Sequence, residues 1–247
     1  MTEENTSEEE DKNKILLIDN YSRGLPTDRI TRIENIINNC LAEVDLKTIH
    51  FTQFKKEMLE EYIGVIISGS ELNVSSFYYD VRLRKKFKPQ LELIRDNIQT
   101  PILALCFGFH LVAYAFGAQI SRMRILGLGG RIIFILLKET DELLTQKNIP
   151  VNVHHLDFVS PNDCKVQENF NIISTSRTIG YRMVQYMKHK EKPIFALQFH
   201  PETHNAYYFH PSLFDDRIAE KTRTVGENII ENFIWMCSYK NKIHENL

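Results

Sequence analysis

The sequence predicts an α/β protein with a doubly wound, mostly parallel central sheet flanked by helices. Residues 15–18 and 63–67 are strongly apolar runs, typical of parallel strands that are covered on both faces. The isoleucines at 30, 33, 36 and 37 lie between these runs and follow the spacing of one helix face. Strands and helices that alternate in this way predict a doubly wound sheet, in which sites lie at the carboxyl ends of the strands.

The other elements up to residue 98 fit the same alternation. Thr27 can cap the first helix, and residues 44–50 alternate like a more exposed strand. Residues 54–61 are expected to form a short helix. Within residues 80–98 a basic run, Arg82–Lys88, is interpreted as a solvated helix face, and a docking surface for a partner protein is the alternative.

Length and composition indicate one globular domain. With 247 residues and 43% hydrophobic content, the chain can bury one substantial core, which is assigned to residues 14–247. Residues 1–13 are acidic and lack apolar periodicity, so a disordered tail is expected there. The net charge of −2 gives no electrostatic reason to expect binding to nucleic acid or to an anionic membrane.

Cysteine usage and hydropathy favour a cytoplasmic protein. The four cysteines, at 40, 106, 164 and 237, show no paired spacing, which argues against a disulfide framework and against a zinc site. The sequence has no apolar run of the roughly 18 residues that a membrane span needs. Its acidic N-terminus is unlike a signal peptide.

The site is expected around residues 101–117. An apolar strand ends at Cys106, Gly108 follows two residues later, and an apolar helix begins at once. Small-x-nucleophile-x-Gly is the pattern of a nucleophile elbow, a tight turn that lifts a side chain above the sheet edge. The positive end of the helix would favour the thiolate form of Cys106. A buried structural cysteine is the competing interpretation.

A second strand, residues 193–199, favours the catalytic interpretation. It ends at His200, with Glu202 two residues beyond. A cysteine, a histidine and a glutamate can supply a nucleophile, a base and a group that orients the base. Ser70, Cys106 and His200 each follow an expected strand, so they should meet at one edge of the sheet.

Cys106-x-Gly108 together with Gln198-Phe-His200-Pro-Glu202 resembles the class I glutamine amidotransferase family of the Cys-His-Glu triad type. The similarity runs from about residue 14 to about residue 238, with its motifs in the expected order. Further matches are the oxyanion loop at 66–70, the His-x-Asp-x-Val segment at 155–159 and the closing helix at 226–233. The resemblance implies a flavodoxin-like fold with an added antiparallel strand region.

The resemblance also implies a mechanism. Cys106 would attack a side-chain amide carbonyl while backbone N–H groups of Ser70 and Phe107 hold the oxyanion. His200, oriented by Glu202, would protonate departing ammonia and then activate water to hydrolyse a γ-glutamyl thioester. No metal or organic cofactor is required. The implied substrate-binding residues are Gly69, Gly108, His110, His155 and Asp157.

A departure from the family pattern at residue 110 leaves the substrate open. Many members have glutamine four residues after the nucleophile, where this chain has His110, and imidazole cannot reproduce both the donor and the acceptor of a carboxamide. One hypothesis is a glutaminase that supplies ammonia to a separate synthetase, since the chain has no Gly-x-x-x-x-Gly-Lys ATP loop. The others are a hydrolase of γ-glutamyl peptides or conjugates and a non-catalytic binding protein, against which the intact triad argues.

Three further segments have sequence patterns that can be interpreted. Adjacent His154 and His155 could suggest a metal site, but neighbouring residues on a strand point to opposite faces, so none is expected. Gly127–Gly130 is interpreted as a hairpin turn leading into a strand at 132–137. The aromatic-rich residues 203–218 are interpreted either as local packing or as a lid or partner-facing surface beside the site.

Overall fold

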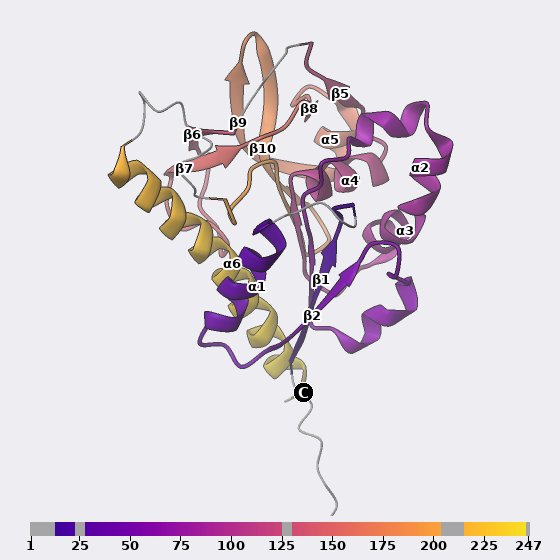
Figure 1. The fold of residues 1–247 in the computed structure, drawn as a ribbon, viewed down its shortest axis with the longest axis vertical. Coiled ribbons are helices and arrows are strands. Elements are labelled where there is room, and N and C mark those ends of the chain that lie inside the picture. The colour runs from indigo at the N-terminus through magenta and orange to yellow at the C-terminus, as the bar shows by residue number, and fades with distance from the viewer. Residues whose placement is uncertain (1–12, 23–27, 125–129, 204–214, 246–247) are drawn as a thin grey trace, which may run out of the picture.

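The computed structural model of the chain describes residues 13–22, 28–124, 130–203 and 215–245 (Figure 1). Its centre is a seven-stranded sheet in the order β2-β1-β3-β4-β11-β10-β9. The strands are β1 (Lys14–Asp19), β2 (Asp45–His50), β3 (Gly64–Ile67), β4 (Ile102–Leu105), β9 (Phe170–Thr178), β10 (Tyr181–His189) and β11 (Ile194–Leu197). Five strands are parallel, and β10 and β9 add the antiparallel edge. The predicted α/β class is confirmed.

Helices cover both faces of the sheet, and two small ribbons complete the fold. The helices are α1 (Asp28–Asn39), α2 (Val81–Lys86), α3 (Lys88–Asp96), α4 (Phe107–Ala115), α5 (Cys164–Asn169) and α6 (Asp216–Glu245), with 3-10 helices η1 (Lys56–Glu61) and η2 (Val74–Tyr78). The antiparallel ribbons pair β5 (Ile120–Arg122) with β8 (Asp157–Val159), and β6 (Arg131–Leu136) with β7 (Asn148–Val153). No described helix is long and apolar enough to cross a membrane.

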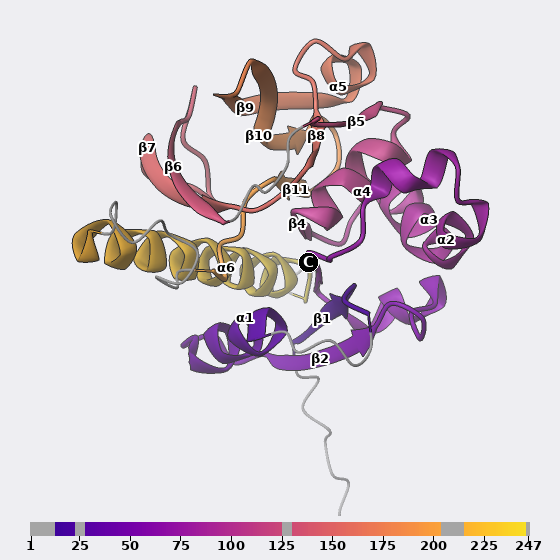
Figure 2. The same cartoon turned by 45° about the horizontal axis from the view of Figure 1, so that its top comes forward.

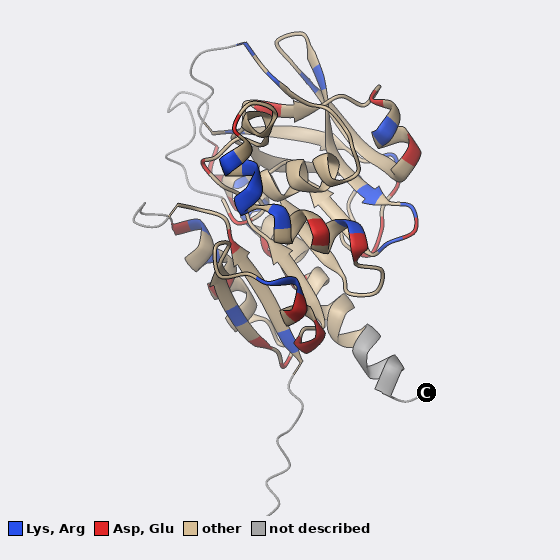
Figure 3. Cartoon of the chain, turned by 90° about the vertical axis from the view of Figure 1, so that its right-hand side faces the viewer, with Lys and Arg blue, Asp and Glu red and all other residues tan. Residues whose placement is uncertain are grey.

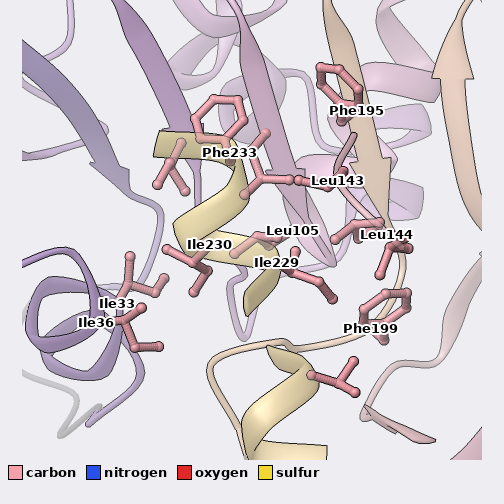
Figure 4. Packing of buried hydrophobic residues seen from close by; sticks show 14 of the residues in the cluster. Ile33, Ile36, Leu105, Leu143, Leu144, Phe195, Phe199, Ile229, Ile230 and Phe233 are labelled. Atoms are coloured by element: carbon pink, nitrogen blue, oxygen red, sulfur yellow. The ribbon is translucent and has the colours of Figure 1, made fainter. Parts of the chain in front are cut away.

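The two layers follow from the period-two alternation of the strands. On β1, Ile15 and Leu17 pack into one core with α1 and α6, whereas Leu16 and Ile18 pack into a second core with α3 and α4. Figure 2 shows α1 and α6 side by side on their face of the sheet. Figure 4 shows this packing close by: Ile33 and Ile36 of α1 lie opposite Ile230 of α6.

Residues 54–98 form more elements than the sequence predicts. The expected helix at 54–61 is the 3-10 helix η1, and the helix expected within 80–98 is divided into α2 and α3 at Phe87. Pro89 lies in the first turn of α3, where its missing N–H costs no helical hydrogen bond. Phe87 itself is buried and stacks on Phe51 at 4.6 Å between ring centroids. The basic residues of α2 are exposed, which agrees with a solvated face (Figure 3).

The strand expected after Gly127–Gly130 is present as β6, but the described strands on either side of this segment do not pair with each other. Residues 125–129 lie outside the described residues, but β5 before them pairs with β8, and β6 after them pairs with β7. The partners of these strands are set by contacts distant in sequence, which a local turn signal does not report. The expected tail at 1–12, Thr27 and residues 204–214 of the aromatic segment also lie outside the described residues.

Helix α6 packs directly onto the loop that follows β11. Gly226 lies so close that a Cβ there would be 2.0 Å from the main-chain oxygen of Pro201, between His200 and Glu202. One turn further on, Ile229 and Ile230 of the same helix are buried in the core shared with α1. The glycine therefore allows a helix anchored in the core to support the loop that carries two expected site residues.

We predict that Gly226→Ala lowers the free energy of unfolding by about 1–3 kcal/mol, because the added methyl group must displace Pro201 or the helix. Helix propensity alone would make alanine more stabilising than glycine, so a loss of stability would come from the contact with Pro201. The urea midpoint would measure it. Asn228→Ala, at an exposed position of the same helix, is the control and should change little. An unchanged or raised midpoint for Gly226→Ala would contradict this packing.

Candidate active site

Cys106 occupies a sharp turn between a buried strand and a helix. β4 ends at Leu105 and α4 begins at Phe107, so Cys106 alone makes the turn, with φ 49° and ψ −94°. A positive φ is uncommon for a residue with a Cβ and carries strain. The main-chain N–H of Cys106 donates to the oxygen of Leu197 on β11 at 2.8 Å, which fixes the turn to the neighbouring strand. The predicted elbow geometry is present.

Gly108 lets the elbow helix approach the sheet. A Cβ at this position would lie 2.5 Å from the main-chain oxygen of Ile67, the last residue of β3. Any side chain would push α4 away from the sheet and carry Cys106 with it. Gly108 is therefore a packing residue of the elbow, and a role in substrate binding stays a prediction.

His200 and Glu202 lie together on the loop after β11. His200 Nδ1 is 2.7 Å from a carboxylate oxygen of Glu202, and each residue is only 1% exposed. The His200 N–H donates to the oxygen of Asn152 at 2.8 Å, which ties the loop to β7. Since the carboxylate can only accept, Nδ1 carries a proton and Nε2 is left to face Cys106.

The charges of this group reinforce one another. Burial and the Arg29 guanidinium lower the pKa of His200, but the charges of Cys106 and Glu202 and a hydrogen bond with Cys106 raise it to about 9. Burial opposes the charge of Glu202 as well, yet His200 and Arg29 hold the pKa of that carboxyl below its ordinary value. The arrangement favours the imidazolium form of His200, which can stabilise a negative charge on the neighbouring sulfur.

The expected oxyanion loop follows β3 at the same edge. Gly69 lies beside the triad, since a Cβ there would be 3.0 Å from Cε1 of His200. The Ser70 hydroxyl donates to the oxygen of Asn20 at 2.7 Å and so fixes this loop to the end of β1. Phe107 is the first residue of α4, where main-chain N–H groups have no partner within the helix. The use of the Ser70 and Phe107 N–H groups as an oxyanion hole stays a prediction.

His110 is buried in α4 and is hydrogen-bonded to Gln198, the residue directly after β11. Its Nε2 lies 2.7 Å from Oε1 of Gln198, whose Nε2 is 4.0 Å from Sγ of Cys106. Burial lowers the pKa of His110, so the ring is neutral and donates from Nε2 to the amide oxygen. His110 thus orients Gln198, and the amide of Gln198 faces the sulfur.

His155 and Asp157 lie near this group, but their polar atoms are bonded elsewhere. The Asp157 carboxylate accepts from the N–H and the hydroxyl of Ser75 at 2.8 and 2.7 Å, which anchors η2. His155 Nδ1 donates to the main-chain oxygen of Asp157 at 2.8 Å, and burial lowers the pKa of His155 to about 3. Their contact with substrate stays a prediction. Within the described ranges, no three His, Cys, Asp or Glu residues are grouped to hold a metal.

Three residues at the triad carry contacts that no sequence motif indicates. Arg29, in the first turn of α1, places Nη1 within 3.0 Å of the His200 ring nitrogens. It also reaches the Tyr21 hydroxyl at 3.3 Å and Nδ1 of His154 at 3.2 Å. The main-chain oxygen of His154 is 4.0 Å from Sγ of Cys106. For Arg29 the sequence offers one signal, because this arginine lies among the apolar positions of the helix predicted from the isoleucine spacing.

Comparison with known proteins agrees with this geometry. A family model described as glutamine amidotransferase class-I matches residues 25–218, most of the chain. The chain belongs to the class I glutamine amidotransferases. It is a cysteine-nucleophile amidohydrolase of that family, as the sequence predicts.

Two relatives of this amidotransferase share one name, being subunits of GMP synthase (glutamine-hydrolyzing). The chain is 29% identical over 189 residues to the subunit from Methanocaldococcus jannaschii, covering 74% of this chain and 79% of the relative. It is 24% identical over 233 residues to the subunit from Methanoregula boonei, covering 91% and 98% of the two chains.

Solved structures share the fold. A putative GMP synthase subunit from Thermoplasma acidophilum aligns with TM-score 0.69 and 24% identity over 95% of this chain and 98% of its own. A glutamine amidotransferase from Thermotoga maritima aligns with TM-score 0.65 and 17% identity over 92% and 98%. The predicted flavodoxin-like amidotransferase fold with added antiparallel strands is confirmed.

We predict that Glu202→Gln shifts the pH profile of Cys106 alkylation by iodoacetamide by about one pH unit, the change in pKa that loss of one neighbouring charge produces. Loss of the Glu202 charge lowers the pKa of His200, so fewer molecules hold the thiolate–imidazolium pair. Peptide mass spectrometry would follow Cys106, with the exposed Cys164 as internal reference. Glu57→Gln, an exposed carboxylate of η1, is the control. Equal rates at Cys106 in both variants would contradict the electrostatic role of Glu202.

Proposed function

We propose that this amidotransferase is the glutamine-hydrolysing subunit of a two-subunit GMP synthase and releases ammonia for a separate synthetase subunit. The observation that carries the proposal is the Cys106 elbow beside the buried His200–Glu202 pair, joined at 2.7 Å. A thiolate, a proton carrier and an orienting carboxylate are the groups that amide hydrolysis through a thioester requires.

In the acylation step the Cys106 thiolate attacks the side-chain amide carbonyl of glutamine. Main-chain N–H groups of Ser70 and Phe107 stabilise the oxyanion of the tetrahedral intermediate. His200 gives its proton to the amide nitrogen, the carbon–nitrogen bond breaks, and ammonia leaves. The product is a γ-glutamyl thioester on Cys106 and a neutral His200 that still donates Nδ1–H to Glu202.

In the deacylation step water attacks the thioester carbonyl. Neutral His200 takes the proton of the water at Nε2, the carbon–sulfur bond breaks, and glutamate leaves. The thiolate and the imidazolium are thereby restored. Because the two steps place opposite demands on one histidine, the surroundings of His200 must support both of its protonation states.

The partner assignment is supported by the relatives. They are named as subunits of a glutamine-hydrolysing GMP synthase, and the match to the Methanoregula boonei protein covers 91% of this chain. The family's triad chemistry supplies ammonia but no activated acceptor, and the sequence contains no Gly-x-x-x-x-Gly-Lys loop for ATP. The proposal therefore assigns the acceptor reaction to the partner.

A second candidate is a γ-glutamyl peptide hydrolase, favoured by one observation. Imidazole at position 110 replaces the family's usual glutamine, and its Nε2 is bonded to Gln198, whose amide nitrogen is 4.0 Å from Sγ of Cys106. A pocket altered in this way could accept a larger group on the γ-amide. The same nucleophile and base would serve that reaction, so the substrate alone separates the two candidates.

We predict that the purified protein releases ammonia from L-glutamine. Cys106→Ser should reduce kcat at least about 1,000-fold, because a serine hydroxyl is a far weaker nucleophile than a thiolate in a site built for cysteine. Cys164→Ser, at an exposed cysteine, is the matched control and should retain activity. Glutamine should have a higher kcat/KM than γ-glutamyl dipeptides. The reverse order would favour the peptide hydrolase, and activity in Cys106→Ser would contradict the assigned nucleophile.

A further inference from the structure

Arg29 contacts the ring of His200 in an unusual way. Its Nη1 is 3.0 Å from Nδ1 and 2.9 Å from Nε2 of the same imidazole. A nitrogen equidistant from both ring nitrogens cannot lie in the ring plane without overlapping Cε1 between them. The guanidinium nitrogen therefore lies over the face of the ring, which leaves the in-plane positions to Glu202 and to Cys106.

The guanidinium is held in place by neutral groups. Arg29 is only 9% exposed, and it contacts the Tyr21 hydroxyl and Nδ1 of His154. Burial raises the pKa of Tyr21, and burial together with the Arg29 charge lowers the pKa of His154 to about 4, so both are neutral near pH 7. Burial opposes the charge on Arg29, but Tyr21, Glu202 and Cys106 raise the pKa of Arg29 above its ordinary value. A fixed positive charge thus faces the imidazole.

This charge matters most when Cys106 is acylated. In the free enzyme the Cys106 thiolate and Glu202 both favour the imidazolium form of His200. Once the sulfur becomes part of a neutral thioester, only Glu202 continues to do so, and the Arg29 cation opposes it. The acyl-enzyme is the state in which His200 must be neutral in order to accept a proton from water.

We propose that Arg29 is a positioning residue that keeps His200 in the neutral form in the acyl-enzyme and so makes it a competent base for deacylation. The proposal rests on the proposed hydrolase function and assigns to α1 a part in the second half of the reaction. The titratable and charged groups that face His200 are Cys106 from the turn after β4, His110 from α4, Glu202 from the same loop, Arg29 from α1, Tyr21 after β1, and His154 and His155 after β7.

The direction of the effect follows from the sign of the charge. A nearby cation disfavours the imidazolium, so removal of Arg29 raises the pKa of His200. The base would then be protonated at a higher pH, and the acid limb of the kcat profile would move upward by about one pH unit. Arg29→Lys retains the charge, whereas Arg29→Gln and Arg29→Met remove it and retain a long side chain.

NMR titration of His200 tests the proposal without turnover. The background is Cys106→Ala, which removes the thiolate as acylation does, and the His200 signal is assigned by its loss in His200→Gln. We expect the pKa of His200 to rise by about one unit in Arg29→Gln and Arg29→Met, and to stay near the parent value in Arg29→Lys. Arg32→Gln is the control, because Arg32 lies on the same helix and pairs with Asp28.

The same substitutions in the Cys106 enzyme should move the acid limb of kcat in the same order. An unchanged His200 pKa in both neutral variants would overturn the proposal, as would a lysine variant that behaves like the neutral ones. Because the titration needs no substrate, a protein that fails to hydrolyse glutamine would refute the proposed function and still report on Arg29. Two neutral variants, Arg29→Gln and Arg29→Met, are used so that the test can still be made if one of them does not fold.

Discussion

The backbone of Cys106 is the constraint on which the site depends. Its positive φ directs the chain from β4 into α4 within one residue, at a strain of about 1–3 kcal/mol. The fully buried strand before it, the hydrogen bond to Leu197 and the close contact of Gly108 with Ile67 hold that conformation. Three adjacent parallel strands therefore fix the sulfur, and the same edge brings it to His200.

Buried charge is the second property that the fold must support. Glu202, His200 and Arg29 are all withdrawn from water, and burial opposes the charged form of each one. Glu202 offsets that cost for both cations, since His200 and Arg29 hold the pKa of its carboxyl below the ordinary value, whereas Arg29 opposes the charge of His200. Loss of Glu202 would leave two buried cations without their counter-charge, which is a strongly destabilising situation in proteins. Through Arg29 a helix distant in sequence, α1, adds a charged side chain to the triad carried by β4 and β11.

Much of the fold and the triad could be predicted because parallel strands impose their own geometry. Apolar runs and helical spacing give the order of elements, and the common edge of the strands brings Cys106 and His200 together. The partners of Arg29 and Asp157 depend on contacts distant in sequence and have no local signal, whereas Pro89 marks the division at Phe87 locally. The pairing of β5 with β8 and of β6 with β7 also depends on distant contacts, since turn residues do not specify which strand pairs with which.

Covalent trapping is the most direct test of the central claim that Cys106 forms a γ-glutamyl thioester with His200 as proton carrier. The protein would be incubated with a glutamine analogue that carries a diazoketone in place of the amide, and the peptides analysed by mass spectrometry. The account predicts one adduct, on Cys106, formed much more slowly in His200→Ala. An adduct on another cysteine, or equal labelling of Cys106 without His200, would contradict it.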